Sequence, residues 1–319
     1  MNARRNSLIA SIGVGVVAII LTVITTYSPV TASPRFYEWS APVNLGPVIN
    51  SAFNDIGPAL SKDGLSLYFY SNRPGGFGGL DIWVSQRASD EDAGGSPINL
   101  GPVINTSATE GVPSFSRDEH WMFFNSNRTG GFGSTDIWVS WRPQTHDDFG
   151  WQTPVNLGPG VNSVGGDSNA TFFANEEGSA PLVFFGSNRL GGPGAGDVYY
   201  SAWVDGTFGP ATLVAELSSP QPDMGGTIRF DGLEFIQFSS RNGSLGNFDL
   251  WGSIRKSTSD IWSTPENLGA IVNSVSNELT PHVSPDGRLL IFGSDRPGGF
   301  GAVDLYVSTR ERINGKQDR

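Results

Sequence analysis

Regularly spaced carboxylates are the residues of this sequence most able to do chemistry. One stands just before each of five short apolar runs: Asp55, Glu110, Asp167, Asp223 and Glu278. If the fold brings them to one axis, they repel one another unless arginine, water or a cation lies among them. Such a ring would suit a basic partner or a hard cation such as Ca²⁺. It would also suit the acid pair of a glycosidase, for which Asp55, Asp167 and Asp223 are candidates.

A second pattern follows each carboxylate and repeats with it. Its clearest copy reads SNRPGGFGGLDIWVS from Ser71 to Ser85. Successive copies lie 55, 61, 52 and 55 residues apart, measured between Arg73, Arg128, Arg189, Arg241 and Arg296. An aspartate keeps step with each arginine: Asp81, Asp136, Asp197, Asp249 and Asp304. Residues that recur in every unit usually hold the fold, so we interpret each arginine as bracketing the aspartate of its own loop.

Each unit has four strand-like runs separated by glycine turns. In the first unit they cover residues 56–61, 66–71, 80–86 and 97–104. Four antiparallel strands in a repeat of this length are typical of a propeller blade. The outer motif Pro-x-Asn-Leu-Gly also occurs before the first unit, from Pro42 to Gly46, and does not follow the last third strand. The sequence therefore predicts an all-β, five-bladed β-propeller of four-stranded antiparallel blades, closed by the N-terminal strand. A stacked solenoid would not need a displaced terminal strand.

The residues give little support to cysteine chemistry, a histidine metal site or phosphate binding. The sequence has no cysteine, and the spacing of His120, His146 and His282 fits no metal site. The Gly-Gly-Phe-Gly loops lack the lysine and helix of a phosphate-binding loop. We expect their aromatic residues to pack between blades or, if exposed, to form an apolar face for a partner: Phe77, Phe132 and Phe300. The third-strand aromatics are expected in the core: Trp83, Trp138, Tyr199, Trp251 and Tyr306.

The first 32 residues differ from the rest of the chain. Arg4 and Arg5 precede an uncharged run from Leu8 to Tyr27, and Val30-Thr31-Ala32 supplies the small residues of a signal-peptidase site. The run is also long enough to span a bilayer if it is not cut. We therefore expect residues 1–32 to be a signal peptide or an N-terminal membrane anchor. Residues 33–40 would then be a linker, and 41–319 a propeller in the periplasm or on the outer face of the cytoplasmic membrane.

Acidic residues outnumber basic ones, with a formal charge of −11. Without residues 1–32 the chain keeps 18 of its 20 basic residues and all 31 acidic ones, a formal charge of −13. Such a surface repels nucleic acid and anionic lipid. We expect no nucleic-acid partner, and contact with a membrane only through an uncleaved N-terminal segment.

The repeat carries a family resemblance. The run TPHVSPDGRLLIFGSDRPGGFGAVDLYVS, from Thr280 to Ser308, resembles the WD40-like repeat of TolB-type periplasmic propellers. The loops and the Pro-Val-Asn-Leu-Gly motif are also similar to propellers found beside OmpA-type peptidoglycan-binding domains. The resemblance covers all five units and is weakest in the fourth, where Asn242-Gly243-Ser244-Leu245-Gly246 replaces the Gly-Gly-Phe-Gly loop. It implies a propeller of the bacterial cell envelope without naming a ligand.

Two functions follow as hypotheses. The first is a non-catalytic exported propeller that binds a protein or a cell-envelope component through the five carboxylates at one channel mouth. The alternative is a glycan-active enzyme or a carbohydrate-binding five-bladed propeller. Glycosidases of this architecture break the blade symmetry at their site, whereas these acids repeat. We therefore expect no catalytic residue and no cofactor, with bound Ca²⁺ left open, in a monomer whose partner is a protein or an envelope glycan.

Overall fold

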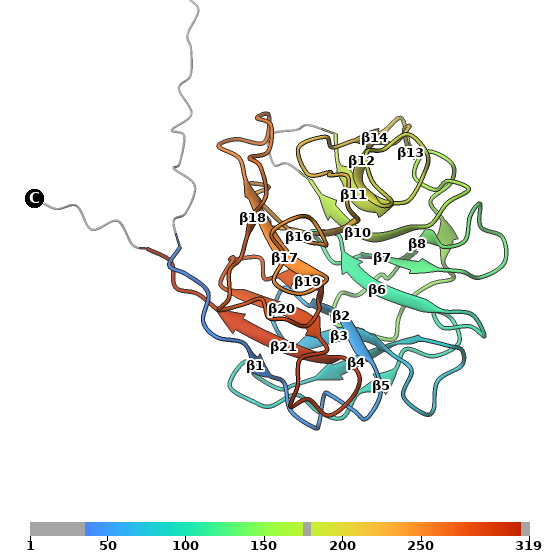
Figure 1. The fold of residues 1–319 in the computed structure, drawn as a ribbon. Coiled ribbons are helices and arrows are strands. Elements are labelled where there is room, and N and C mark those ends of the chain that lie inside the picture. The colour runs from blue at the N-terminus through green and yellow to red at the C-terminus, as the bar shows by residue number, and fades with distance from the viewer. Residues whose placement is uncertain (1–35, 175–179, 314–319) are drawn as a thin grey trace, which may run out of the picture. The chain divides into compact units, whose positions relative to one another are not determined.

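The structure is a computed structural model that describes residues 36–174 and 180–313. Within these residues the chain forms strands and turns without a helix, and the strands make five antiparallel sheets (Figure 1). No helix in these ranges could therefore span a membrane. The predicted signal peptide or anchor, residues 1–32, lies outside the described residues.

Each sheet is one blade, with its strands ordered outward from the centre. The first blade contains β2 (Asp55–Leu60), β3 (Ser66–Ser71), β4 (Asp81–Gln86) and β5 (Ile98–Asn99). The second contains β6 (Glu110–Phe115), β7 (Trp121–Ser126), β8 (Asp136–Trp141) and β9 (Val155–Asn156). The third contains β10 (Asp167–Phe173), β11 (Leu182–Ser187), β12 (Asp197–Val204) and β14 (Thr212–Leu213), with β13 (Thr207–Phe208) also paired to β12. The fourth contains β15 (Asp223–Ile228), β16 (Glu234–Ser239), β17 (Asp249–Ile254) and β18 (Glu266–Asn267).

The N-terminal strand closes the last blade, which confirms the prediction. This blade contains β19 (Glu278–Val283), β20 (Leu289–Ser294), β21 (Asp304–Thr309) and β1 (Val43–Asn44). Val43 lies opposite Val307 in the antiparallel pair of β1 and β21. The first strands contact one another in a ring, β2 to β6, β10, β15, β19 and back to β2, and those labelled in Figure 1 lie toward its middle. The fold is thus a five-bladed β-propeller with a central axis.

Apolar side chains of neighbouring blades form the core. One cluster joins Tyr68 and Ile82 of the first blade to Met122 and Phe124 of the second. The third-strand aromatics are buried as predicted: Trp83, Trp138, Tyr199, Trp251 and Tyr306. Their burial supplies much of the contact between blades, because large aromatic side chains cover the most apolar area.

The outer strands are shorter than the sequence predicts. Instead of residues 97–104, only Ile98–Asn99 pairs with β4. Gly101 has a φ of 81°, which glycine adopts without a Cβ clash, so the chain turns there. Asn105 then replaces the missing strand, because its side chain accepts the Ile82 N–H (2.8 Å) and donates to the Ile82 carbonyl (2.9 Å). Asn50, Asn162 and Asn273 bond the backbone of the equivalent strands in the same way.

Residues 36–40, predicted as part of a linker, contact the last blade. Trp39 is buried, and the guanidinium of Arg310 lies 4.0 Å from the centre of its ring. The N–H of Tyr37 donates to the carbonyl of Glu311 (2.9 Å). The propeller body therefore includes residues from at least Phe36 onward, ahead of the predicted boundary at residue 41.

Candidate functional site

Every predicted carboxylate is buried and paired with the repeat arginine of its own blade. The closest N–O distances are 2.5 Å for Asp55–Arg73, 3.1 Å for Glu110–Arg128, 2.7 Å for Asp167–Arg189 and 2.9 Å for Glu278–Arg296. Asp223 and Arg241 form the fifth pair. None of the five carboxylates has exposed surface. Their charges are therefore compensated inside the blades, as buried charges must be.

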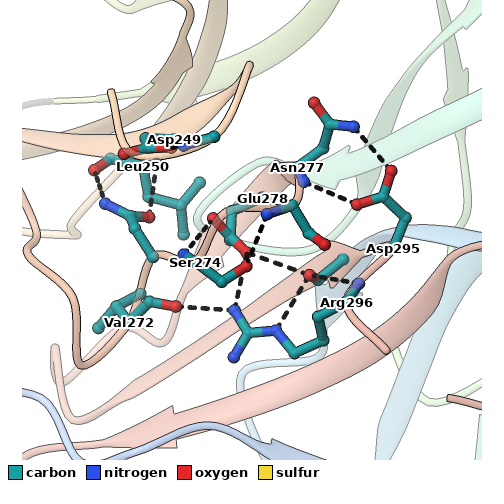
Figure 2. A network of polar contacts seen from close by, with 12 residues as sticks. Asp249, Leu250, Val272, Ser274, Asn277, Glu278, Asp295 and Arg296 are labelled. Carbon is teal, nitrogen blue, oxygen red and sulfur yellow. Dashed lines mark hydrogen bonds and ion pairs between the residues drawn. The ribbon is translucent and has the colours of Figure 1, made fainter. Parts of the chain in front are cut away.

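Figure 2 shows the network of the fifth blade, which joins two blades. Arg296 donates from Nη2 to Glu278 (2.9 Å) and to the carbonyl of Val272 (2.7 Å). Ser274 donates to the same carboxylate through its N–H and its hydroxyl. Val272 follows β18 of the fourth blade, so the arginine ties the inner strand of one blade to the outer segment of the preceding one. The same carbonyl contact recurs at Ile49, Ile104, Val161 and Leu217.

The repeat aspartates do not pair with the repeat arginines, and this corrects the predicted pairing. Asp81 accepts the N–H groups of Phe77 and Gly78, and it also accepts the side-chain amide of Asn99 (2.9 Å). It therefore closes the glycine-rich loop and fixes the outer strand. Asp136, Asp197, Asp249 and Asp304 accept loop N–H groups in the same way. Each repeat arginine instead faces the carboxylate that begins the inner strand of its own blade, because that strand lies beside the loop that carries the arginine.

The central channel is lined by the residues that directly follow the carboxylates, and the carboxylates themselves do not line it. Ile56, Ser168, Met224 and Leu279 border a cavity on the axis, and each directly follows a repeat carboxylate. Successive side chains of a strand point to opposite sides, so the carboxylate points into the blade when its successor points to the axis. The expected acid-rimmed mouth is therefore absent from the described surface, and partner binding by these acids stays a prediction without support.

The cavity on the axis has a volume of about 380 Å³ and is lined by residues of all five blades. This volume lies within the range of small-molecule sites, about 300–1,000 Å³. Among the described residues that line it, none is acidic or basic. Its polar groups are amides and hydroxyls, as at Tyr70, Asn125 and Asn169. The candidate site is therefore uncharged, in contrast to the acidic chain around it.

Several polar groups of the cavity lack a partner. The Oδ1 atoms of Asn125 and Asn169 are buried and accept no hydrogen bond from any described residue. The hydroxyls of Tyr70 and Ser134 also line the cavity. Buried polar groups are usually satisfied, so unpaired ones that face a cavity indicate a ligand or water that completes them. Burial raises the pKa of Tyr70, so its hydroxyl remains available as a donor.

A ring of backbone with positive φ surrounds the cavity. The third residue of each inner strand has a φ between 44° and 82°: Gly57, Val112, Asn169, Gly225 and Thr280. The pairing of every inner strand is shifted at this place, as in a β-bulge. Val112 and Thr280 are β-branched, for which this conformation costs about 1–3 kcal/mol. A positive φ is kept in all five blades, and in three of them by a residue other than glycine, so backbone geometry at the cavity wall serves more than pairing.

Two positions of this wall differ from blade to blade. The fifth residue of the middle strand is Tyr70, Asn125, Gly186, Phe238 or Gly293, and the third residue of the inner strand also varies. The two positions are matched in size, since a Cβ on Gly57 would lie 2.3 Å from the ring of Tyr70. None of these residues belongs to the repeated motif, so recurrence in the sequence does not point to them. The signal that does is the departure from the repeat.

The histidines have separate structural environments. His282 lies on β19 and borders a smaller cavity of about 60 Å³, which shares Val112, Asn169 and Thr280 with the first. Its Nε2 accepts the N–H of Leu60 of the first blade (3.3 Å), and burial lowers its pKa to about 4. His120 contacts the carbonyl of Arg142, and His146 lies near Asp63. No three His, Asp or Glu side chains cluster for a metal within residues 36–174 and 180–313. Calcium binding stays an untested prediction.

The loop phenylalanines are half exposed and do not pack between blades. Phe77, Phe132 and Phe300 each have a relative exposure of 50%. The glycine after the first of them explains why, because a Cβ on Gly78 would lie 1.9 Å from the carbonyl oxygen of Ala108 in the next segment. The loop backbone therefore contacts the next blade directly, and the aromatic side chain points outward.

Comparison with solved structures supports the fold. The catalytic domain of a Coprinopsis cinerea GH62 alpha-L-arabinofuranosidase has a TM-score of 0.61 at 14% identity, covering 88% of this chain and 99% of that one. An endo-arabinase from Bacteroides thetaiotaomicron has a TM-score of 0.52 at 15% identity, covering 87% and 99%. At such low identity these likenesses show the shared five-bladed β-propeller fold alone.

The resemblance to TolB-type repeats is not strengthened at this level. TolB from Acinetobacter baumannii is found with a TM-score of 0.49 at 16% identity, covering 83% of this chain and 56% of that one. No protein-family model and no curated protein matches the sequence. The class defined by fold and site is a five-bladed β-propeller with an uncharged central cavity, and the TolB-type assignment stays a prediction.

Proposed function

We propose that this chain is a carbohydrate-binding propeller that holds a neutral sugar in its central cavity. The observation that carries the proposal is the uncharged wall, in which the amide oxygens of Asn125 and Asn169 are buried and unpaired beside the hydroxyl of Tyr70. Sugar hydroxyls both donate and accept hydrogen bonds, so they complement amide oxygens and hydroxyls without needing a charge. Phe238 and Met224 supply apolar surface for the carbon atoms of a ring.

Binding is better supported than hydrolysis. A glycosidase needs two carboxylates that flank the scissile bond, about 5–9.5 Å apart. Asp55, Asp167 and Asp223, the candidates from the sequence, are each held by an arginine and have no exposed surface. The described residues that line the cavity offer no other carboxylate. The glycosidases found by comparison share the fold, and a carbohydrate ligand would agree with them without implying their reaction.

The hypothesis of a protein partner on an acidic mouth has less support, because its five carboxylates lie inside the blades. If the N-terminal residues direct export, as the sequence predicts, the ligand would be a glycan outside the cytoplasm.

Calorimetric titration with neutral pentose and hexose oligosaccharides tests the proposal. Asn169→Gly removes one unpaired amide oxygen and places the residue that the first and fourth blades carry at this position, so the positive φ is tolerated. We expect this variant to weaken binding about tenfold, the cost of one lost hydrogen bond in a buried site. Asp205→Gly is the matched control, since it makes the same replacement at a positive φ outside the cavity, and it should bind like the native chain.

Two results would overturn the proposal. One is that no member of the panel binds. The other is that Asn169→Gly binds every ligand as tightly as the native chain does. Release of reducing sugar from a polysaccharide panel would overturn the non-catalytic part alone.

A further inference from the structure

A groove between the second and third blades carries exposed tryptophans. Its volume is about 600 Å³, and its wall includes Trp121, Trp141 and Trp203 with Phe208. Trp121 is 44% exposed and Trp203 is 43% exposed, although indole rings are usually well buried. We call this feature the indole groove. It shares no residue with the central cavity.

Trp203 breaks a second repeat of the chain. The position six residues after the repeat aspartate is an arginine in four blades: Arg87, Arg142, Arg255 and Arg310. In three of these the guanidinium stacks on a tryptophan, as Arg142 does on Trp151 at 4.4 Å from the ring centre. In the third blade Trp203 replaces the arginine and meets Phe208 edge-on at 5.0 Å. The replacement removes a charge and exposes an indole.

The rest of the groove combines the apolar residues Val139, Val155 and Leu157 with uncharged polar ones. Gln152, Thr153 and Thr207 line it, are exposed, and make no side-chain hydrogen bond to any described residue. The described lining contains no acidic or basic side chain, on a chain whose formal charge is −11. Trp121 and Trp141 lie 6.4 Å apart at an angle of 56°, so their rings present a bent surface and not one flat plane.

We propose that the indole groove binds a segment of a neutral polysaccharide, at a second site separate from the central cavity. Indole faces cover the C–H faces of sugar rings, while amides and hydroxyls beside them meet the ring hydroxyls. An anionic polymer would find no counter-charge in the groove and would be repelled by the net charge of the chain. The proposal rests on residues other than those of the proposed function and stands if the cavity binds nothing.

Affinity electrophoresis in gels that contain a soluble neutral polysaccharide tests the groove, with arabinoxylan, mixed-linkage β-glucan and hydroxyethylcellulose as probes. Trp203→Arg restores the residue of the other blades, which can stack on Phe208 and keep the fold. Trp121→Ala removes the second exposed indole. Each should raise the Kd for the retarding polymer about tenfold, as expected when one aromatic anchor is lost.

Two controls separate this site from others. Val275→Ala removes an exposed apolar side chain outside the groove and should leave retardation unchanged. Asn169→Gly alters the central cavity and should also leave it unchanged. Thermal melts of all variants establish that they are folded. If Trp203→Arg unfolds, Trp121→Ala decides alone.

Three outcomes would overturn the inference. The first is that no polymer of the panel retards the native chain. The second is equal retardation of the native chain and the folded tryptophan variants. The third is that Asn169→Gly loses retardation while the tryptophan variants keep it, which would place the polymer in the cavity.

Discussion

The buried acid–arginine pairs and the wall of the central cavity lie one residue apart along the inner strands, yet they follow opposite rules. The pairs are chemically alike in all five blades, and each joins two segments of chain. The wall differs from blade to blade, from Tyr70 to Gly186 on the middle strands. Neighbouring positions can diverge in this way because they point to opposite sides of the strand. Recurrence thus marks the residues that hold blades together, and departure from it marks candidate binding sites.

The largest expected effect breaks a repeated pair. Asp55→Ala leaves the guanidinium of Arg73 without its carboxylate in a site where little water can reach it. Removing one partner of a buried pair costs about 3–5 kcal/mol. Denaturant unfolding should show this loss in the free energy of unfolding. The exposed Glu91→Ala is the control and should change stability by about 0.5 kcal/mol or less. Similar stability of the two variants would contradict the structural role of the pairs.

A smaller effect concerns His282, which borders the smaller cavity, departs from the repeat and yet serves the fold. Its folded pKa is about 4, below its ordinary value of 6.5, so the unfolded chain binds more protons between these values. Stability is therefore complete above pH 6.5 and falls as the pH drops toward 4, by about 1–3 kcal/mol. Unfolding titrations across this range measure it. His282→Gln should flatten the dependence, and an equally steep curve in that variant would assign it to other groups.

The strained wall should tolerate glycine. Val112→Gly relieves a positive φ in a β-branched residue, but it also loses buried apolar surface and adds backbone freedom to the unfolded chain. These terms oppose each other, so we expect stability to stay within about 1 kcal/mol of the native value. Thermal denaturation checks this. A loss as large as that of Asp55→Ala would mean that wall and pairs are equally structural.

The smallest effect is expected at the loop tips. Phe300→Ser replaces a half-exposed side chain whose loop is held by backbone contacts to Asp304. The free energy of unfolding should change by about 0.5 kcal/mol or less, as for most surface substitutions. Chemical denaturation measures it, and a change of several kcal/mol would show that the phenylalanine packs in the folded chain.

Much of the architecture could be predicted from the printed residues, and the candidate sites could not. The repeat of Arg73 and Asp81 located every blade, and the motif at Pro42–Gly46 located the closing strand. The cavity wall escaped prediction because Tyr70 and Asn125 look like ordinary strand residues until their side chains are placed. The indole groove escaped it because Trp203 lies on the same strand as the buried Tyr199, and only the packing of the blades leaves Trp203 exposed.

The sequence by itself determined the number of blades, their order and the closure of the ring. It could do so because a blade cannot bury its apolar faces alone, so the repeated units must pack on one another, and the displaced N-terminal strand closes them into a ring. Only the tertiary structure decided which carboxylate each arginine meets, how deep the acids lie and which side chains face the axis. Those outcomes depend on contacts between the inner strand of one blade and the outer segment of the blade before it, and spacing along the chain does not specify such contacts.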